Sequence, residues 1–132
     1  MALTDVSDGS RSVEFGVNPH KVTLARACQA GDILGVASDN FDDLGPAYSA
    51  AGAHSTSVTY FPRLVAATRG AADEVITAFS IAIVSGYTSA NAHKYLYMAQ
   101  TSGVAGQISE TAPTGTGSCA AIIGTPIATN RV

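Results

Sequence analysis

The sequence lacks tryptophan altogether and has few charged residues. Only 13% of its 132 residues are Asp, Glu, Lys or Arg, well below the roughly 25% typical of globular proteins. The net charge is −3 and no basic run is present. We therefore expect no nucleic-acid partner, because nucleic-acid binding needs a concentrated positive surface. The longest apolar stretch, residues 75–84, is too short to cross a bilayer, so no membrane partner is expected either.

Several sequence signals of sorting and metal binding are also missing. Residues 1–12 have neither a basic nor an apolar segment of the kind found in signal peptides, which predicts synthesis in the cytoplasm. Cys28 and Cys119 have no CxxC spacing and no histidine at zinc-finger distance. We interpret both as small buried thiols in a reducing compartment.

Hydrophobic residues are abundant, at 46% of the chain, and many are alanine. Glycine, serine and threonine are also frequent, so the predicted core is built from small side chains. A chain with much apolar surface and few charges is poorly protected against association. This composition favours a protein that buries surface against copies of itself or against a partner.

Short apolar runs recur between Gly, Pro, Asn and Asp residues, as is typical of an all-β fold. Residues 12–17 alternate apolar and polar side chains, Asn18-Pro19 predicts a turn, and alternation resumes from Lys21. Residues 74–85 are apolar on both faces. A buried helix over 71–84 is the alternative there, but β-branched content favours a strand. We predict a small β-barrel or β-sandwich with short strands.

The predicted organisation is an extended N-terminal arm over residues 1–12 and a single β-rich domain over residues 13–132. Residues 38–57 are rich in Asp, Gly, Ser and Ala and show no periodic pattern. We predict a long loop there. Because structureless loops of this length are usually functional, we expect it to make contacts.

A search for catalytic or metal-binding patterns finds none. His20, His54 and His93 are far apart and form no metal-binding motif. The acidic cluster at 39–43 lacks the spacing of a calcium loop. The sequence therefore predicts no enzyme activity, no catalytic residues, no metal site and no cofactor.

Four segments carry a resemblance to a known family. They are AGDILGV at 30–36, YLY at 95–97, GQISETAPT at 106–114 and IIGTPI at 122–127. In this order and spacing they resemble the small capsid decoration, or head cement, proteins of tailed bacteriophages. The long segment at 38–57 and the interruption at Pro62 depart from that pattern.

The resemblance implies a structural virion protein that binds the outer surface of the assembled capsid and stabilises the shell. It implies a homotrimer on the capsid exterior, with the major capsid protein as its partner. We expect capsid contacts from the N-terminal arm, through Leu3, Val6 and Arg11. Contacts with sister subunits or partners are expected from aromatic residues, namely Phe41, Tyr48, Tyr60, Tyr95 and Tyr97.

Two other functions fit the same sequence. The chain resembles a domain of a head fibre or tail spike in its terminal hairpin, which is a second structural role in a virion. A carbohydrate-binding β module is the other alternative, because its tyrosines could line a sugar groove.

Overall fold

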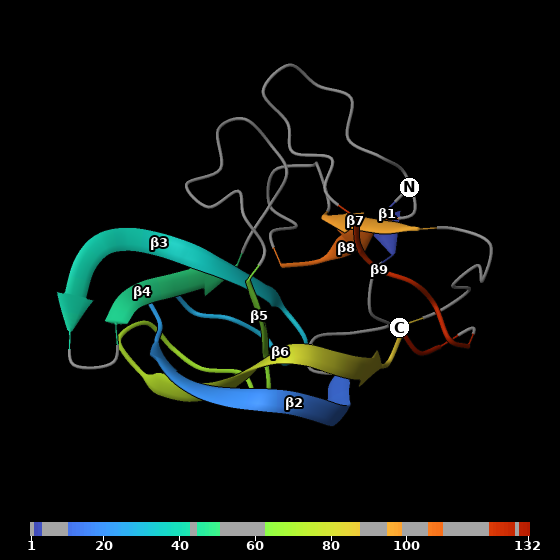
Figure 1. The fold of residues 1–132 in the computed structure, drawn as a ribbon, viewed down its shortest axis with the longest axis horizontal. Helices are drawn as coiled ribbons and strands as arrows, with labels where there is room; N and C mark the ends of the chain where they lie inside the picture. Colours follow the sequence, from blue (N-terminus) through green and yellow to red (C-terminus); the bar gives the residue numbers. More distant parts are fainter. Residues whose placement is uncertain are drawn as a thin grey trace, which may run out of the picture.

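The computed structural model describes residues 2–3, 11–42, 45–50, 63–87, 95–98, 106–109, 122–128 and 130–132. These residues form nine β-strands in two sheets and no helix (Figure 1). The predicted all-β fold is therefore confirmed. In the part of the chain that the structure describes, no helix could span a membrane.

The larger sheet has five antiparallel strands in the order β2-β6-β5-β3-β4. Their bounds are β2 (Ser12–Thr23), β3 (Ile33–Asp42), β4 (Gly45–Ala50), β5 (Leu64–Ala66) and β6 (Val75–Ser85). The sheet curls into a half-barrel, so that Leu24, just after β2, bridges to Tyr48 of β4. The amide of Ala25 donates to the Tyr48 carbonyl over 2.7 Å and reinforces this contact.

The smaller sheet has four short antiparallel strands in the order β1-β8-β7-β9. Their bounds are β1 (Ala2–Leu3), β7 (Leu96–Met98), β8 (Ile108–Ser109) and β9 (Ile122–Gly124). The C-terminal Val132 exchanges two backbone hydrogen bonds with Val84 of β6, over 2.8 and 3.0 Å. Val132 also packs against the cluster that contains Leu96 and Ile108 of the smaller sheet.

Two hydrophobic clusters stabilise this arrangement. The first fills the half-barrel and is centred on Leu24 and Leu34, which are fully buried. The second lies around Val84, Leu96 and Ile108, where the end of β6 meets the smaller sheet. Burying one such leucine contributes about 1.5–3 kcal/mol, so the two clusters account for the cohesion of both sheets.

Residues 75–85 form strand β6, which confirms the predicted strand and excludes the helix over 71–84. The turn predicted at Asn18-Pro19 is wrong, because β2 runs through both residues. Asn18 takes a φ of 57°, which kinks the strand without ending it. Proline has no backbone N–H. Pro19 is tolerated because β2 is an edge strand, and the side of β2 that has no neighbouring strand requires no N–H donor.

The loop predicted over residues 38–57 is wrong for most of its first half. Residues 38–42 continue β3 and residues 45–50 form β4, so this segment is the end of a long β-hairpin. Gly45 has a φ of 102°, a value that glycine tolerates and other residues rarely adopt. Residues 51–57 lie outside the described residues. The predicted N-terminal arm is represented by Ala2 and Leu3, which pair with Ser109 and Ile108.

Candidate functional site

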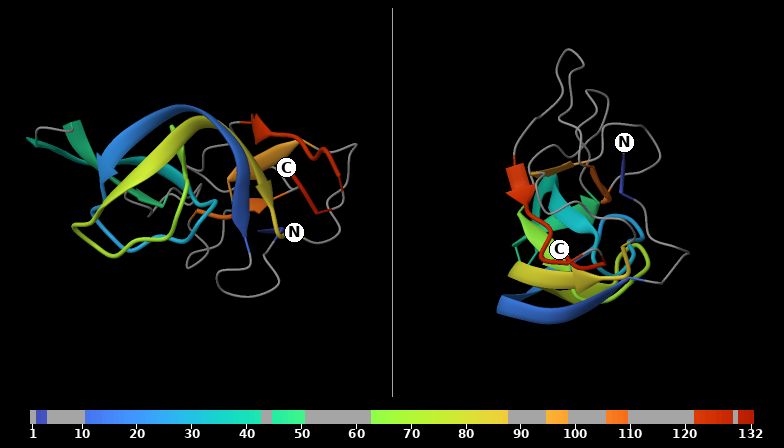
Figure 2. Two further views of the ribbon diagram at one scale, coloured as in Figure 1. Left: turned by 90° about the horizontal axis from the view of Figure 1, so that it is seen from below. Right: turned by 90° about the vertical axis from the view of Figure 1, so that its right-hand side faces the viewer.

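Strands β2 and β6 carry a run of apolar cross-strand pairs. The two strands run side by side along the lower boundary of the molecule in Figure 1 and arch across it in Figure 2. Three successive cross-strand pairs are entirely apolar, and we call these six residues the outer strip: Phe15 with Ile83, Val17 with Ile81 and Pro19 with Phe79. Opposite residues of an antiparallel pair share one face of the sheet.

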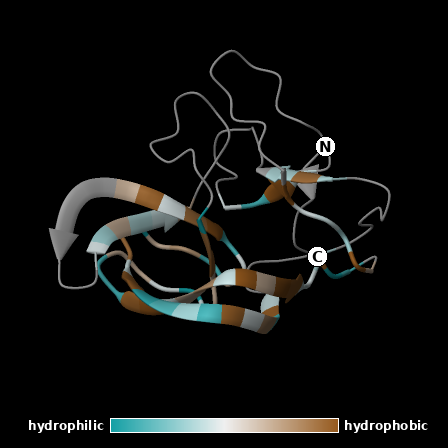
Figure 3. Cartoon of the chain, in the orientation of Figure 1, coloured by the Kyte–Doolittle hydropathy of each residue, from teal (hydrophilic) through white to brown (hydrophobic). Residues whose placement is uncertain are grey.

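Half of the outer strip is open to solvent: Phe15, Pro19 and Ile81 are exposed, while Val17, Phe79 and Ile83 are partly buried. Phe15 is 58% exposed and Ile81 is 63% exposed, which places both among the exposed large hydrophobic residues of the described chain. The ring of Phe79 lies over Gly16 of β2, where an added Cβ would come within 2.3 Å of its Cγ. The alternating hydropathy along both strands is visible in Figure 3. A contiguous exposed apolar surface of this kind marks a contact site.

Polar pairs lie at both ends of the outer strip. At one end, the Lys21 ammonium donates to the Thr77 hydroxyl over 3.0 Å. At the other end the Ser12 and Ser85 hydroxyls lie 2.9 Å apart. Beside them, Glu14 and Arg131 form a half-exposed ion pair of 3.0 Å. An apolar centre with a polar rim is the usual composition of a protein–protein contact.

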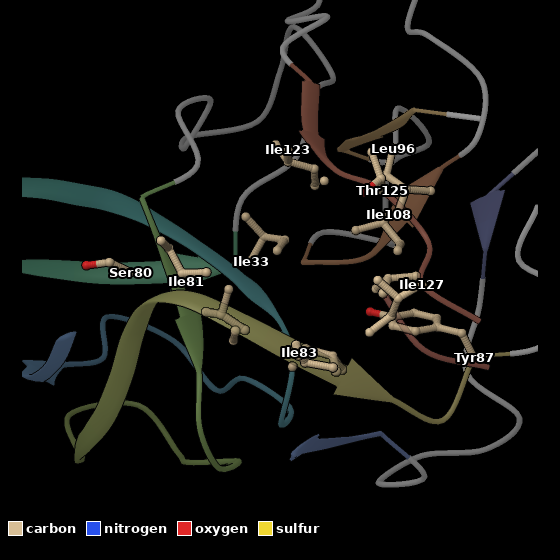
Figure 4. A pocket seen from close by; sticks show the side chains of 16 residues that line it. Ile33, Ser80, Ile81, Ile83, Tyr87, Leu96, Ile108, Ile123, Thr125 and Ile127 are labelled. Atoms are coloured by element: carbon tan, nitrogen blue, oxygen red, sulfur yellow. The ribbon is translucent and has the colours of Figure 1, made fainter. Parts of the chain in front are cut away.

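An apolar hollow adjoins the outer strip where β6 faces the smaller sheet. It has a volume of about 320 Å³, and Figure 4 shows Ile33, Ile81 and Ile123 among the side chains around it. The register explains the continuity, because Phe79 of the strip pairs with Val65, which in turn pairs with Ile33. The outer strip and the apolar hollow therefore form one extended apolar surface.

A buried ion pair joins the start of β2 to the start of β3. The Arg11 guanidinium donates to Asp32 over 2.5 Å, and the two side chains are only 2% and 6% exposed. Asp32 also accepts a hydrogen bond of 2.9 Å from the Gln29 amide. Burial alone would lower the pKa of Arg11, but Asp32 and Tyr87 outweigh this effect and raise it. Arg11 thus stays charged and holds the two strands together.

Cys28 is a buried free thiol, as predicted. Burial, reinforced by the nearby Asp32 carboxylate, raises the pKa of this thiol to about 11. The thiolate is the nucleophilic form of cysteine, so Cys28 is unreactive near neutral pH. Cys119 lies outside the described residues.

The residues predicted to contact the capsid are in different places. The backbone of Leu3 pairs with Ile108 in the smaller sheet. Arg11 is in the interior, so its position does not fit the predicted capsid contact, because its guanidinium is already buried against Asp32. Val6 lies outside the described residues.

The structure describes four of the five aromatic residues predicted to contact other subunits, and they lie in different strands or next to them. Tyr48 is 9% exposed and belongs to the half-barrel core, so it offers little surface. Phe41 is near the end of the β3–β4 hairpin. Tyr95 is 59% exposed and Tyr97 is half-buried in β7. Tyr60 lies outside the described residues. Of the tyrosines that the structure describes, Tyr48 belongs to the half-barrel core whereas Tyr95 and Tyr97 belong to the smaller sheet, so these three do not form one site.

Sequence reasoning missed the outer strip as a site. The available signals were that residues 75–84 are apolar on both faces and that residues 13–17 of β2 alternate apolar and polar side chains. An antiparallel strand with apolar residues on both faces is typical of burial on both sides. The sequence alone does not say which of the two apolar faces the fold covers.

No protein family, curated protein or solved structure was found to match this chain. Among the described residues, no group of three or more His, Cys, Asp or Glu is placed to hold a metal ion. The candidate site is therefore defined by its surface chemistry alone, as an apolar contact face with polar ends.

Proposed function

We propose that this protein is a structural virion protein that binds the outer surface of an assembled phage capsid, as a homotrimer, and stabilises the shell. The single observation that carries the proposal is the outer strip, an apolar sheet face left open to solvent beside an apolar hollow. Its natural partner is the major capsid protein. The family resemblance of the sequence supports the same role.

The physical mechanism is selective binding to the finished shell. A protein that binds the assembled state but not the separated subunits stabilises assembly by mass action. A trimer presents three copies of its contact face at once, so modest individual contacts give a large combined affinity. An apolar face bounded by polar groups suits this task, since it loses water on contact while its rim sets the register.

The test is binding of the purified protein to expanded capsids that lack decoration. We expect saturable binding of many copies spread over the head, and an increase in the temperature at which the heads disrupt. Unexpanded heads and separated capsid subunits are the controls, and we expect weak binding to both. Binding of only a few copies at the tail, or no binding to expanded heads, would contradict the proposal.

A further inference from the structure

Strand β6 has an interruption in its pairing on the side away from β2. On the β2 side it is paired from Val75 to Ser85. On the other side, β5 pairs with it only as far as Phe79, and the C-terminal residues pair with it again from Val84 onwards. Residues 80–83 lie between these two partners, and none of the described residues pairs with them on this side. We call residues 80–83 the open edge of β6.

The open edge presents main-chain hydrogen-bonding groups. Both the N–H and the C=O of Val84 bond to Val132 on this side, over 2.8 and 3.0 Å. In an antiparallel ladder the backbone groups of alternate residues point to the same side, so the N–H and C=O of Ala82 face this side as well. A strand edge with such groups is a template for pairing with another chain.

The apolar hollow lies directly beside the open edge. All four residues of the open edge line the hollow. Figure 4 shows Ile81 and Ile83 of the open edge on one side of it and Leu96 and Ile108 of the smaller sheet on the other. None of the described residues that line it has a charged side chain, and its volume of about 320 Å³ is at the small end of the range for ligand pockets. The hollow therefore suits a short, apolar and uncharged occupant.

We propose that a short extended apolar segment of a partner protein binds along the open edge of β6, pairs with the backbone of Ala82 and places an apolar side chain in the hollow. In this mode of recognition the main-chain hydrogen bonds give affinity and the side-chain pocket gives specificity. The paired part of the segment is limited to the span of residues 80–83, because β5 and the C-terminal residues are paired with β6 on either side. The lining selects a segment without charged side chains, since burying an unpaired charge is costly.

This inference deepens the proposed function and rests on it for one point only, the source of the segment, which is the capsid partner that contacts the outer strip. The outer strip supplies side chains alone. The open edge adds main-chain hydrogen bonds, which require the partner segment to be extended. The peptide site itself is defined without reference to any capsid.

The test is binding of synthetic peptides to the full chain, followed by fluorescence anisotropy. The probe is a fluorescein-labelled heptapeptide of alternating valine and threonine with blocked ends. Two control peptides keep every side chain but are N-methylated, one on the valines and the other on the threonines. Because only alternate N–H groups of an added strand face β6, we expect one control peptide to bind at least about tenfold more weakly than the other, since it leaves a main-chain acceptor of β6 without its partner.

Gly124→Leu tests the hollow from the side of the protein. Gly124 lines the hollow, and a Cβ added there meets no atom within 4 Å, so the leucine narrows the hollow without displacing a neighbour. We expect this variant to bind the probe at least about tenfold more weakly, because the apolar side chain of the peptide loses its buried position. Ala71→Leu is the matched control, since it adds a leucine at an exposed position outside the hollow, and it should bind the probe like the wild type.

Amide hydrogen exchange, measured by NMR with and without the probe, reports the pairing directly. We expect the Ala82 amide to exchange more slowly in the complex, while the Val84 amide, which already donates to Val132, changes little. The inference would be overturned by a probe that does not bind, by equal affinity of the two methylated peptides, or by a folded Gly124→Leu variant that binds like Ala71→Leu. An Ala82 amide that exchanges at the same rate in both states would also overturn it.

These measurements need no capsid, which separates this inference from the proposed function. Their failure overturns the peptide site and leaves the contact through the outer strip in place. A protein that binds the probe but ignores expanded heads would overturn the proposed function and leave the peptide site intact.

Discussion

The two faces of the β2–β6 ribbon contain similar apolar side chains in opposite surroundings. On the inner face, Val22, Ile76 and Ala78 are at most 6% exposed, because the half-barrel closes over them. On the outer face, Phe15 and Ile81 are more than half exposed. Hydrophobic alternation thus predicts which side chains avoid water. The fold decides which of these side chains are buried within the subunit. We infer that a partner covers the outer face.

The same substitution on the two faces of β6 gives the sharpest contrast, and the inner one has the largest expected effect. Ile76→Ser removes a buried side chain and places a hydroxyl in the half-barrel core, so we expect a loss of about 4 kcal/mol in the free energy of unfolding. Urea denaturation followed by circular dichroism measures it. A loss below about 1 kcal/mol, the average for all substitutions, would mean that the inner face is not the core.

The buried ion pair of Arg11 and Asp32 lies in the interior, at the start of β2 and β3. Asp32→Ala leaves the Arg11 guanidinium buried without its carboxylate, so we expect a loss of about 3 kcal/mol in the free energy of unfolding. Arg11→Met combined with Asp32→Ala removes both charges and should be more stable than Asp32→Ala alone. Equal or lower stability of the double variant, measured in the same urea titration, would contradict a pairing role for Arg11.

The smallest effect on stability is expected on the outer face. Ile81→Ser changes a side chain that is 63% exposed, so the free energy of unfolding should change by no more than about 0.5 kcal/mol. Thermal melting of the isolated protein in solution measures this change. A loss as large as that of Ile76→Ser would show that the outer strip is covered within the subunit.

Much of the fold follows from the sequence because period-two alternation is a local signal. Residues 75–85 could be predicted as a strand from their β-branched and alternating side chains. The β3–β4 hairpin could not be predicted, because its Asp, Gly and Pro residues favour loops and only pairing with distant strands stabilises it. Asn18 and Pro19 also favour a turn when the sequence is considered alone. Only the long ladder of backbone pairs between β2 and β6 shows that the strand continues through them.

The candidate site is less predictable than the fold. Arg11 and Asp32 are 21 positions apart, and no local pattern links them. The outer strip depends on which face of β6 the curled sheet encloses, which is a property of the whole sheet. His20 and Lys21 line one hollow with Arg63, which is distant in sequence, because closure of the curled sheet brings β2, β4 and β5 together. Sequence reasoning could identify the chemical types but not their placement.

The most direct test of the central claim is the occupancy of expanded heads by the Phe15→Ser/Ile81→Ser variant. Val75→Ser is the matched control, since Val75 is 52% exposed in the same strand but lies beyond the outer strip. We predict that the double variant binds heads at least about tenfold more weakly, equivalent to about 1.4 kcal/mol, while Val75→Ser binds like the wild type. Equal occupancy of heads by all three proteins would contradict the assignment of the outer strip as the contact face.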